Sequence, residues 1–305
     1  MKLDGLKCAI AAVALGALMI PGYAPAGSIE DDLKWTMSLV NTELEIRGAD
    51  YRLEMVEYLT AGDEQGRTVF FSDVGNKQLA FDFVPGDPRR TAWSGPVGPG
   101  DDITWASDLV EGDAGSGIGI PATQAAIMRA MGTWNAVQCS NLPLTSVAVL
   151  GDLGFLQFSL TGSGAPFPAA DITQAGFGTP VDPFLPPPII AATCTFIFID
   201  ASGNPTDIDN NGKVDAALRE IYYTFNFPWG INTNSPIDVE TVVLHETGHG
   251  LSQAHFGKLF RTDANGKLHF TPRAVMNAGY TGIQQQIGKT DNAGHCSNWA
   301  NWPNK

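Results

Sequence analysis

The residues best suited to chemistry in this 305-residue chain lie between His245 and His255. His245 and His249 are four residues apart, so on a helix their imidazoles share one face, as two ligands of one ion require. Glu246 follows the first histidine, where it can reach a metal-bound water without filling a coordination position. If the chain turns back after the helix, His255 supplies a third nitrogen. Three protein ligands plus water form an open, catalytic zinc arrangement.

A second stretch, Arg-Ala-Val-Met-Asn-Ala-Gly-Tyr, follows roughly twenty residues later and ends at Tyr280. Together with the histidine spacing, it resembles the metzincin clan of zinc endopeptidases, and most closely the matrixin-like branch. The matching positions are His245, Glu246, His249, His255, Met276 and Tyr280. One position departs from the family, because Ser252 stands where Gly or Asn usually ends the helix in a left-handed conformation. Serine can adopt positive φ there, at a cost of roughly 1 kcal/mol or more relative to glycine, so this position leaves the exact turn open.

The resemblance implies an α+β fold for the catalytic part of the chain. That fold has a twisted, mostly parallel sheet with an antiparallel edge strand, an active-site helix, a methionine turn and a C-terminal helix. Met276 would lie in the turn beneath the zinc as an apolar floor, and Tyr280 would shape the pocket for the residue after the cleaved bond. By the same resemblance, the edge strand at residues 221–227 would pair with an extended substrate.

A second metal site is indicated by the loop at residues 207–215. Its oxygen side chains recur at two-residue spacing, as in the front half of a calcium loop, with Gly212 at the sharp turn. Hard oxygen ligands favour calcium over zinc. Leu218 stands where such loops carry a bidentate Glu, so the site would need another carboxylate, with Glu220 as one choice, or bind weakly. The predicted positions are Asp207, Asp209, Asn211, Lys213 and Asp215; the alternative is an Asx-rich turn without metal.

The first residues and the composition predict an exported protein. Residues 1–26 carry early lysines, an apolar run and small residues for cleavage, which is typical of a secretory signal peptide. The formal net charge is −14, which argues against nucleic acid or an anionic membrane as partner. We therefore expect an extracellular or periplasmic protein without a membrane anchor after signal cleavage.

Three cysteines remain once Cys8 leaves with the signal peptide. An exported protein with three cysteines is expected to form one disulfide and keep one spare thiol. We predict the pair Cys139–Cys194, because each of them borders an apolar run expected in the core. Cys296 would then be free.

Residues 27–95 read as a small α+β unit of their own. A helix at 29–47 precedes three alternating segments at 51–59, 68–72 and 79–84, which predict a meander. A Pro- and Gly-rich linker then separates this unit from a peptidase domain at residues 101–305. The unit could be a pro-segment that covers the site, and Asp87 faintly resembles an inhibitory aspartate, although an Asp-Pro turn explains it as well.

The later chain is expected to follow the metzincin order of elements. Strands are predicted at 102–110, 145–150, 155–160, 193–200 and 220–227, and a helix at 121–138. Ser235 is the expected N-cap of the active-site helix, and Val239, Val242, Val243 and Leu244 would bury its back. Thr290 or Asp291 is expected to cap a last short helix.

These patterns predict a secreted zinc endopeptidase that acts on protein or peptide substrates. Zinc would activate a bound water, and Glu246 would act as general base and then general acid. The alternative is a catalytically silent, metal-dependent binding or adhesion module on the same fold. The presence of Glu246 argues against that alternative, because a structural zinc needs no base beside its ligands. A third hypothesis is a factor that processes only its own pro-segment. The sequence leaves the oligomeric state and the natural substrate open.

Overall fold

The computed structural model describes residues 27–62, 64–73, 75, 81–93, 102–149, 151–178, 181–233 and 236–304. The predicted signal peptide at residues 1–26 lies outside the described residues. So do the linker residues 95–100 and the predicted N-cap Ser235. Among the described helices, none is long and apolar enough to cross a membrane.

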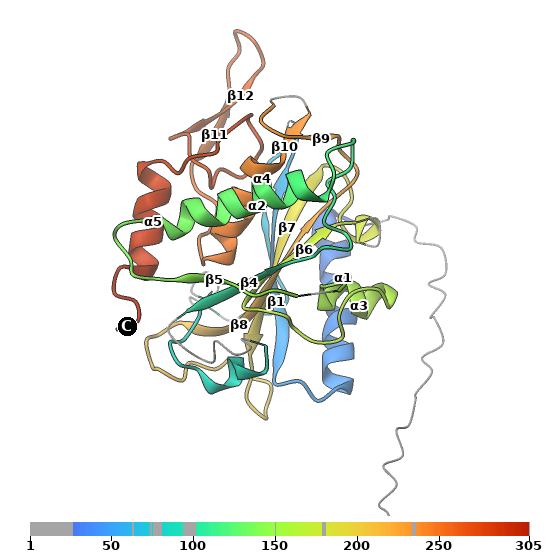
Figure 1. The fold of residues 1–305 in the computed structure, drawn as a ribbon, viewed down its shortest axis with the longest axis vertical. Coiled ribbons are helices and arrows are strands. Elements are labelled where there is room, and N and C mark those ends of the chain that lie inside the picture. The colour runs from blue at the N-terminus through green and yellow to red at the C-terminus, as the bar shows by residue number, and fades with distance from the viewer. Residues whose placement is uncertain are drawn as a thin grey trace, which may run out of the picture.

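A central sheet of mixed direction organises the described chain (Figure 1). Its strand order is β2-β1-β7-β8-β6-β4-β5, with β3 paired to β8. Strands β5, β4, β6 and β8 run parallel, and β7 is antiparallel to β8 and to β1. The strands are β1 Tyr51–Thr60, β2 Thr68–Phe70, β3 Phe81–Asp82, β4 Ile103–Ser107, β5 Leu144–Ser146, β6 Ile172–Phe177, β7 Ile189–Phe198 and β8 Val214–Tyr223.

Helices cover both faces of this sheet and enclose two hydrophobic clusters. On one face, α2 (Ile120–Asn135) and α4 (Val239–Gly250) enclose a cluster that also contains Trp299 of α5 (Lys289–Trp299). On the other face, α1 (Ile29–Ile46) and α3 (Phe155–Thr161) enclose the second cluster. The fold is therefore mixed α and β, with helices packed on both sides of one sheet. The expected helices at 29–47 and 121–138 are confirmed within a few residues.

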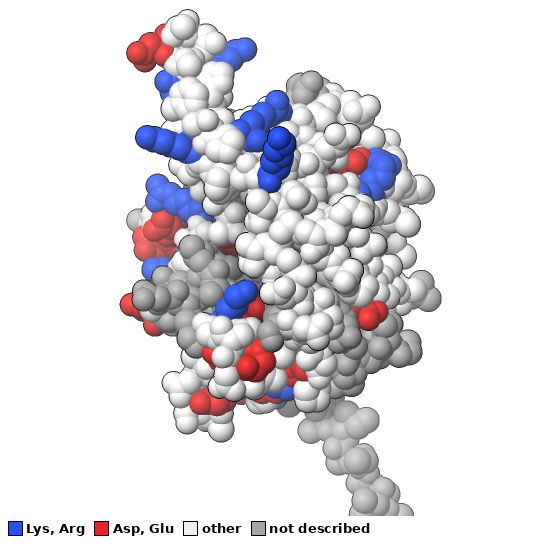
Figure 2. Space-filling model, turned by 90° about the vertical axis from the view of Figure 1, so that its left-hand side faces the viewer, with Lys and Arg blue, Asp and Glu red and all other residues white. Residues whose placement is uncertain are grey.

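Short elements complete the structure around this core. The pair β9 (Trp229–Gly230) and β10 (Ile237–Asp238) precedes α4, and the hairpin β11 (Lys258–Arg261) and β12 (Leu268–Thr271) projects from the body (Figure 1). In the described part of the chain, 3-10 helices lie at Pro88–Ala92 and Asp182–Phe184. Figure 2 shows basic side chains mainly around the projecting hairpin and acidic ones mainly toward the opposite end.

Three predicted secondary-structure assignments are wrong. The predicted strand at 155–160 is helix α3, because the Glu220 carboxylate accepts the backbone N–H groups of Phe155 and Leu156 and caps the helix start. Helix α4 begins after Asp238, since the chain stays extended through β10 and Asp238 accepts the Thr241 N–H. The last helix has Gly288 as N-cap, and Asp291 is its third residue.

The predicted substrate-pairing strand is also wrong. Strand β8 covers 214–223 rather than 220–227, and it lies between β7 and β6. Both of its edges are hydrogen-bonded within the sheet, so it has no free edge for a peptide. The antiparallel strand beside the helix α4 is β7, whose Thr193 hydroxyl donates to the Glu246 carboxylate.

The expected meander in residues 27–95 does not form a sheet of its own. Strand β1 pairs with β2 as expected, but its other edge pairs with β7 from Tyr51↔Phe198 to Thr60↔Ile189. Strand β3 pairs with β8 rather than with β2. The apolar face of α1 packs into the same cluster as residues of β7 and β8. The N-terminal residues therefore share the central sheet with the later chain.

The predicted Cys139–Cys194 disulfide is wrong, because the bridge joins Cys139 to Cys296. Cys139 follows α2 and Cys296 lies on α5, and both pack against the cluster on the α4 side. Cys194 lies on β7 with its side chain in the cluster on the α1 side, so the sheet separates it from Cys139. Cys194 is a free, buried cysteine.

The disulfide predicts a measurable contribution to stability. It closes a loop with a sequence separation of 157, for which the chain-entropy model gives about 5 kcal/mol as an upper limit. We expect Cys296→Ser to lower the free energy of unfolding by several kcal/mol in urea denaturation. Cys139→Ser is the matched variant and should lose the same amount. Two variants that unfold like the native chain would contradict this bridge.

Candidate metal centre

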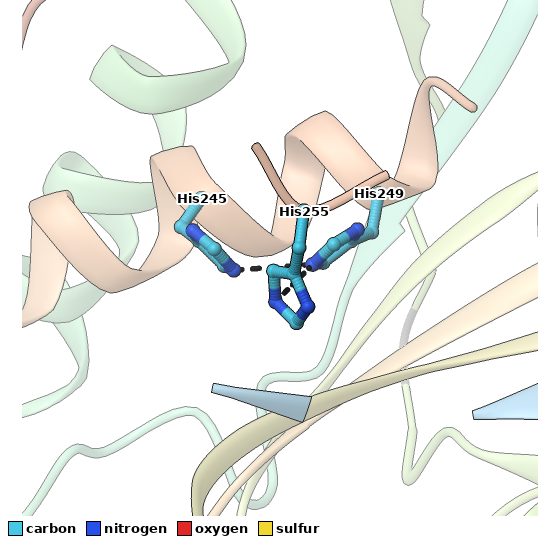
Figure 3. Close-up of side chains that lie close together, drawn as sticks. All are labelled: His245, His249 and His255. Atoms are coloured by element: carbon cyan, nitrogen blue, oxygen red, sulfur yellow. Dashed lines mark hydrogen bonds between the residues drawn. The ribbon is translucent and has the colours of Figure 1, made fainter. Parts of the chain in front are cut away.

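Three histidine side chains meet at the end of helix α4 (Figure 3). His245 and His249 project from the same face of the helix, and their Nε2 atoms lie 3.1 Å apart. The chain then turns, and His255 places its Nε2 atom 3.2 Å from that of His249. The structure therefore brings together all three histidines that the sequence indicated.

Backbone carbonyls determine which ring nitrogens face one another. Nδ1 of His245 lies 2.7 Å from the Val275 carbonyl oxygen, and Nδ1 of His249 lies 2.7 Å from that of Gln253. A carbonyl can only accept, so each Nδ1 carries a proton, and in the neutral imidazole each Nε2 keeps its lone pair. Lone pairs that converge at this distance repel unless a cation lies between them. This donor set fits a metal ion, and three imidazoles suit zinc.

Burial keeps two of the imidazoles neutral. His245 is 2 % exposed, and burial, followed by the nearby His249, lowers its pKa well below the usual value. The same two causes, with His245 added, lower the pKa of His255. For His249, burial lowers the pKa, but the adjacent Glu57 and Glu246 carboxylates outweigh it and raise the pKa overall.

Glu246 is a fully buried carboxyl group beside the histidines. One oxygen, Oε2, accepts a hydrogen bond from the Thr193 hydroxyl at 2.7 Å, while the buried Oε1 has no partner among the described residues. Burial raises the pKa of Glu246 to about 7; the neighbouring His249 and the Thr193 hydrogen bond only partly offset that effect. A carboxyl group with this pKa can both take and return a proton near neutral pH.

The turn after α4 is held by a buried arginine. Ser252 has φ 63°, a left-handed conformation, so the turn that the sequence left open forms with serine at this position. Arg219 on β8 donates from Nη1 to the Gly250 carbonyl oxygen at 2.7 Å and from Nη2 to the Ser252 hydroxyl at 3.0 Å. These bonds satisfy the helix end and fix the turn that carries the chain to His255. The histidine motif alone did not indicate Arg219. The signal that could have indicated it is an arginine within the mostly apolar sequence of strand β8.

The segment around Met276 supports the histidines from below the helix. The backbone N–H groups of Val275 and Met276 donate to the Asp291 carboxylate of α5, and Val275 in turn accepts from His245. A Cβ atom on Gly248 would lie 2.2 Å from Met276 Sδ, so only glycine permits this close packing. Asp291, the third residue of α5, thus supports the segment around Met276 and is not the N-cap that the sequence suggested.

Tyr280 lies near the start of α4 rather than at the histidines. Its hydroxyl accepts the Asp238 N–H at 3.0 Å, and its own N–H donates to the Thr60 carbonyl oxygen at 2.9 Å. The residue therefore ties the segment after Met276 to the helix start and to the end of β1.

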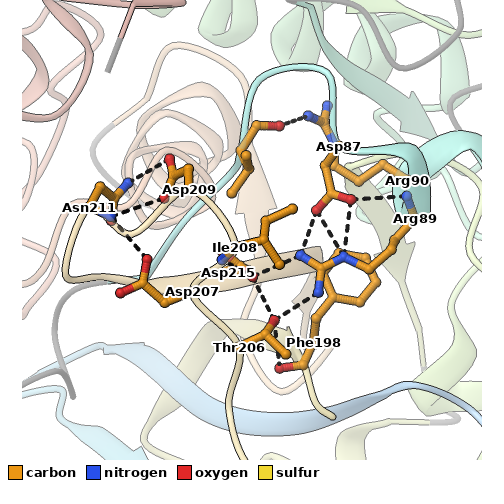
Figure 4. Close-up of polar contacts among 11 residues, drawn as sticks. Asp87, Arg89, Arg90, Phe198, Thr206, Asp207, Ile208, Asp209, Asn211 and Asp215 are labelled. Atoms are coloured by element: carbon orange, nitrogen blue, oxygen red, sulfur yellow. Dashed lines mark hydrogen bonds and ion pairs between the residues drawn. The ribbon is translucent and has the colours of Figure 1, made fainter.

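The predicted calcium loop brings its three carboxylates together (Figure 4). Asp207, Asp209 and Asp215 each offer an oxygen within 4.8 Å of the others, and Asn211 hydrogen-bonds to both Asp207 and Asp209. However, Asp215 accepts from Arg89 at 2.8 Å and from the Thr206 hydroxyl at 2.5 Å, so it is already neutralised.

Two further charged residues near this loop are paired. Lys213 Nζ lies 3.2 Å from an Asp82 oxygen, so its side chain faces a carboxylate. Asp87, the weakly indicated inhibitory aspartate, pairs with Arg89 at 2.7 Å in the same network (Figure 4). The structure thus assigns Asp87 to this cluster of ion pairs rather than to the histidines.

Calcium at residues 207–215 stays a prediction that a thermal titration tests. With Asp215 neutralised we expect a weak site, with a dissociation constant of roughly 0.1–1 mM. At about 10 mM Ca²⁺ such a site stabilises the fold by roughly 1.4–2.7 kcal/mol, seen as a rise in Tm. The double variant Asp207→Asn/Asp209→Asn should lose this rise. The same rise in wild type and variant would place the calcium elsewhere.

A second prediction concerns the turn that delivers His255. Both Ser252→Ala and Ser252→Gly lose the hydrogen bond from Arg219, but only glycine relieves the left-handed strain. We expect the alanine variant to be less stable than the glycine variant by about 1 kcal/mol in urea denaturation. Equal stabilities of the alanine and glycine variants would contradict the view that the positive φ at position 252 is strained.

Comparison with known proteins adds no assignment. No family model matches the chain, and no curated protein matches it. The conclusions about this site therefore rest on its own geometry.

Proposed function

We propose that the protein is a zinc-dependent endopeptidase of the metzincin type. The observation that supports this most is the set of three converging imidazole nitrogens beside a buried carboxyl group. His245, His249 and His255 would hold the zinc. When bound there, the ion would lower the pKa of a water molecule toward about 7 and polarise the peptide carbonyl.

The chain's own residues supply the proton transfer and the orientation of the base. Glu246 takes a proton from water as general base and returns it to the leaving amine as general acid. Thr193 holds the Glu246 carboxyl from the neighbouring strand, which leaves Oε1 for the proton. The carbonyls of Val275 and Gln253 keep two ligands in the tautomer that binds metal.

The setting of the enzyme follows from the same reasoning. We infer export from the leader-like start at residues 1–26, and a disulfide between Cys139 and Cys296 suits an oxidising compartment. The substrate would be a protein or peptide. Calcium at the 207–215 loop would brace the chain that leads into β8.

The silent binding module remains the second candidate because of one observation. His245, Glu246 and His249 are 2 %, 0 % and 0 % exposed, and of the three histidines only His255 is partly exposed. A structural metal would need no access. The two functions differ in the role of Glu246, because only the peptidase needs it as general base and general acid.

Substitution of Glu246 separates these functions. We expect Glu246→Gln to keep zinc near one ion per chain and to lose peptide hydrolysis by a factor of at least about 100, the usual contribution of general acid–base catalysis. Glu240→Gln, on the same helix and paired with Arg129, is the matched control and should retain activity. Activity is measured on casein or a quenched peptide library. A Glu246→Gln variant as active as the control would contradict the proposed role.

A further inference from the structure

A cluster of basic side chains lies on the projecting hairpin of β11 and β12 (Figure 2). We call residues 256–273 the basic hairpin. It carries four basic residues and one acidic residue, in a chain with 18 basic and 32 acidic residues. All four basic side chains are exposed, namely Lys258, Arg261, Lys267 and Arg273. Neither of the two lysines forms an ion pair with another described residue. The basic hairpin is thus a local positive surface on an acidic protein.

Asn277 fixes the basic hairpin beside the histidines. Its Nδ2 atom donates to the Phe256 carbonyl oxygen at 2.7 Å and to that of Pro272 at 3.2 Å, so one amide holds both ends of the hairpin. The Phe256 N–H donates to the Met276 carbonyl oxygen at 2.7 Å. A Cβ atom on Gly257 would lie 2.6 Å from Asn277 Nδ2, and the φ of 97° also favours glycine there. The hairpin therefore starts at a fixed position, directly after the third histidine of the site.

That third histidine lies where solvent comes closest to the proposed metal centre. His245 and His249 are buried, whereas His255 is partly exposed. The next residue, Phe256, is 46 % exposed, and Lys258 at the start of β11 is exposed as well. A peptide that approaches the histidines from the side of His255 therefore passes the basic hairpin.

The two faces of the hairpin differ in character. On one face lie Lys258 and Phe260, two residues apart on β11, and the Phe260 ring stacks on that of His269 with centroids 5.3 Å apart. On the other face, Leu259 and Phe270 lie opposite each other in the ladder and are half-buried. The open face thus offers a cation beside an aromatic ring that is 43 % exposed.

Among anionic partners, the surroundings of the hairpin favour a peptide. The tip at residues 262–266 is polar and contains Asp263, so it is unsuited to the hydrocarbon of a membrane. A nucleic acid would extend past the four cations along a chain whose net charge is −14, which repels it. A short acidic segment of a peptide can contact the basic hairpin alone.

We propose that the basic hairpin selects peptide substrates that carry acidic side chains near the cleaved bond. This inference rests on the peptidase function proposed above and names its substrate class. Lys258, Lys267 and Arg273 attract the carboxylates, and Phe260 supplies an apolar contact beside them. Because exposed ion pairs are individually weak, the preference comes from several cations together and falls as salt screens them.

Two charge-reversed variants test the inference. Lys258→Glu/Lys267→Glu reverses two cations of the basic hairpin. Lys34→Glu/Lys289→Glu is the matched control, because it changes the net charge equally at exposed lysines outside the hairpin. Both are placed in the zinc-loaded Glu246→Gln background, so that peptides bind without being cleaved. The probes are labelled peptides with one apolar centre and three Glu or three Gln residues, placed before the centre in one pair and after it in another.

The first readout is the dissociation constant of each peptide from fluorescence anisotropy, which does not depend on catalysis. At about 0.1 M salt we expect the Glu peptide of at least one pair to bind at least about 5-fold more tightly than its Gln counterpart. The preference should vanish at about 1 M salt, where the Debye length is about 3 Å. It should be lost in Lys258→Glu/Lys267→Glu and kept in the control. Equal binding of Glu and Gln peptides to the native hairpin, or the same loss in the control, would overturn the inference.

Hydrolysis of the same peptides by protein with native Glu246 separates the two proposals. We expect kcat/KM to follow the same order as binding, with the difference in KM, because the hairpin contributes to binding and not to proton transfer. Equal cleavage of Glu and Gln peptides contradicts the role of the hairpin and leaves the peptidase standing. If acidic peptides bind through the hairpin but none is cleaved, the peptidase proposal fails and the basic hairpin stands as the binding surface of the silent module.

Discussion

The convergence of three imidazole nitrogens is the constraint on which the rest of this structure depends. Two backbone carbonyls hold the Nδ1 protons of His245 and His249, so the Nε2 lone pairs must face one another. A cation bound between these nitrogens would remove the repulsion, which is the basis for proposing a metal site here. The hydrogen bonds that the Val275 and Gln253 carbonyls accept therefore orient the proposed ligands for a metal ion.

The residues that support the three histidines come from elements far apart in the sequence. Arg219 of β8 fixes the turn that leads to His255, and Asp291 of α5 fixes the segment that accepts from His245. Strand β1 reaches the same place through Glu57. The arrangement of the three histidines thus depends on the packing of the whole sheet.

The sequence was sufficient where the information is local. The spacing of His245 and His249 on one helix face predicted that their imidazoles lie together. Amphipathic periodicity likewise located α1 and α2 within a few residues. Each of these properties is decided by neighbours a few residues away.

Properties set by long-range packing were not accessible in this way. The Cys139–Cys296 bridge depends on which side of the sheet each cysteine faces, and spacing says nothing about that. The pairing of β1 with β7 joins segments well over a hundred positions apart in the sequence, as Tyr51↔Phe198 shows. Helix α3 replaces a predicted strand because distant Glu220 caps it. Short apolar runs suit a helix or a strand, and tertiary contacts decide between them.

The measurement that tests the central claim most directly is X-ray absorption at the zinc edge of the zinc-loaded protein. The geometry predicts a first shell of three imidazole nitrogens and one oxygen, at about 2.0–2.1 Å. In His255→Ala the number of imidazole nitrogens should fall to two. A sulfur ligand near about 2.3 Å, or a shell made of oxygen alone, would contradict a metal centre built from these three histidines.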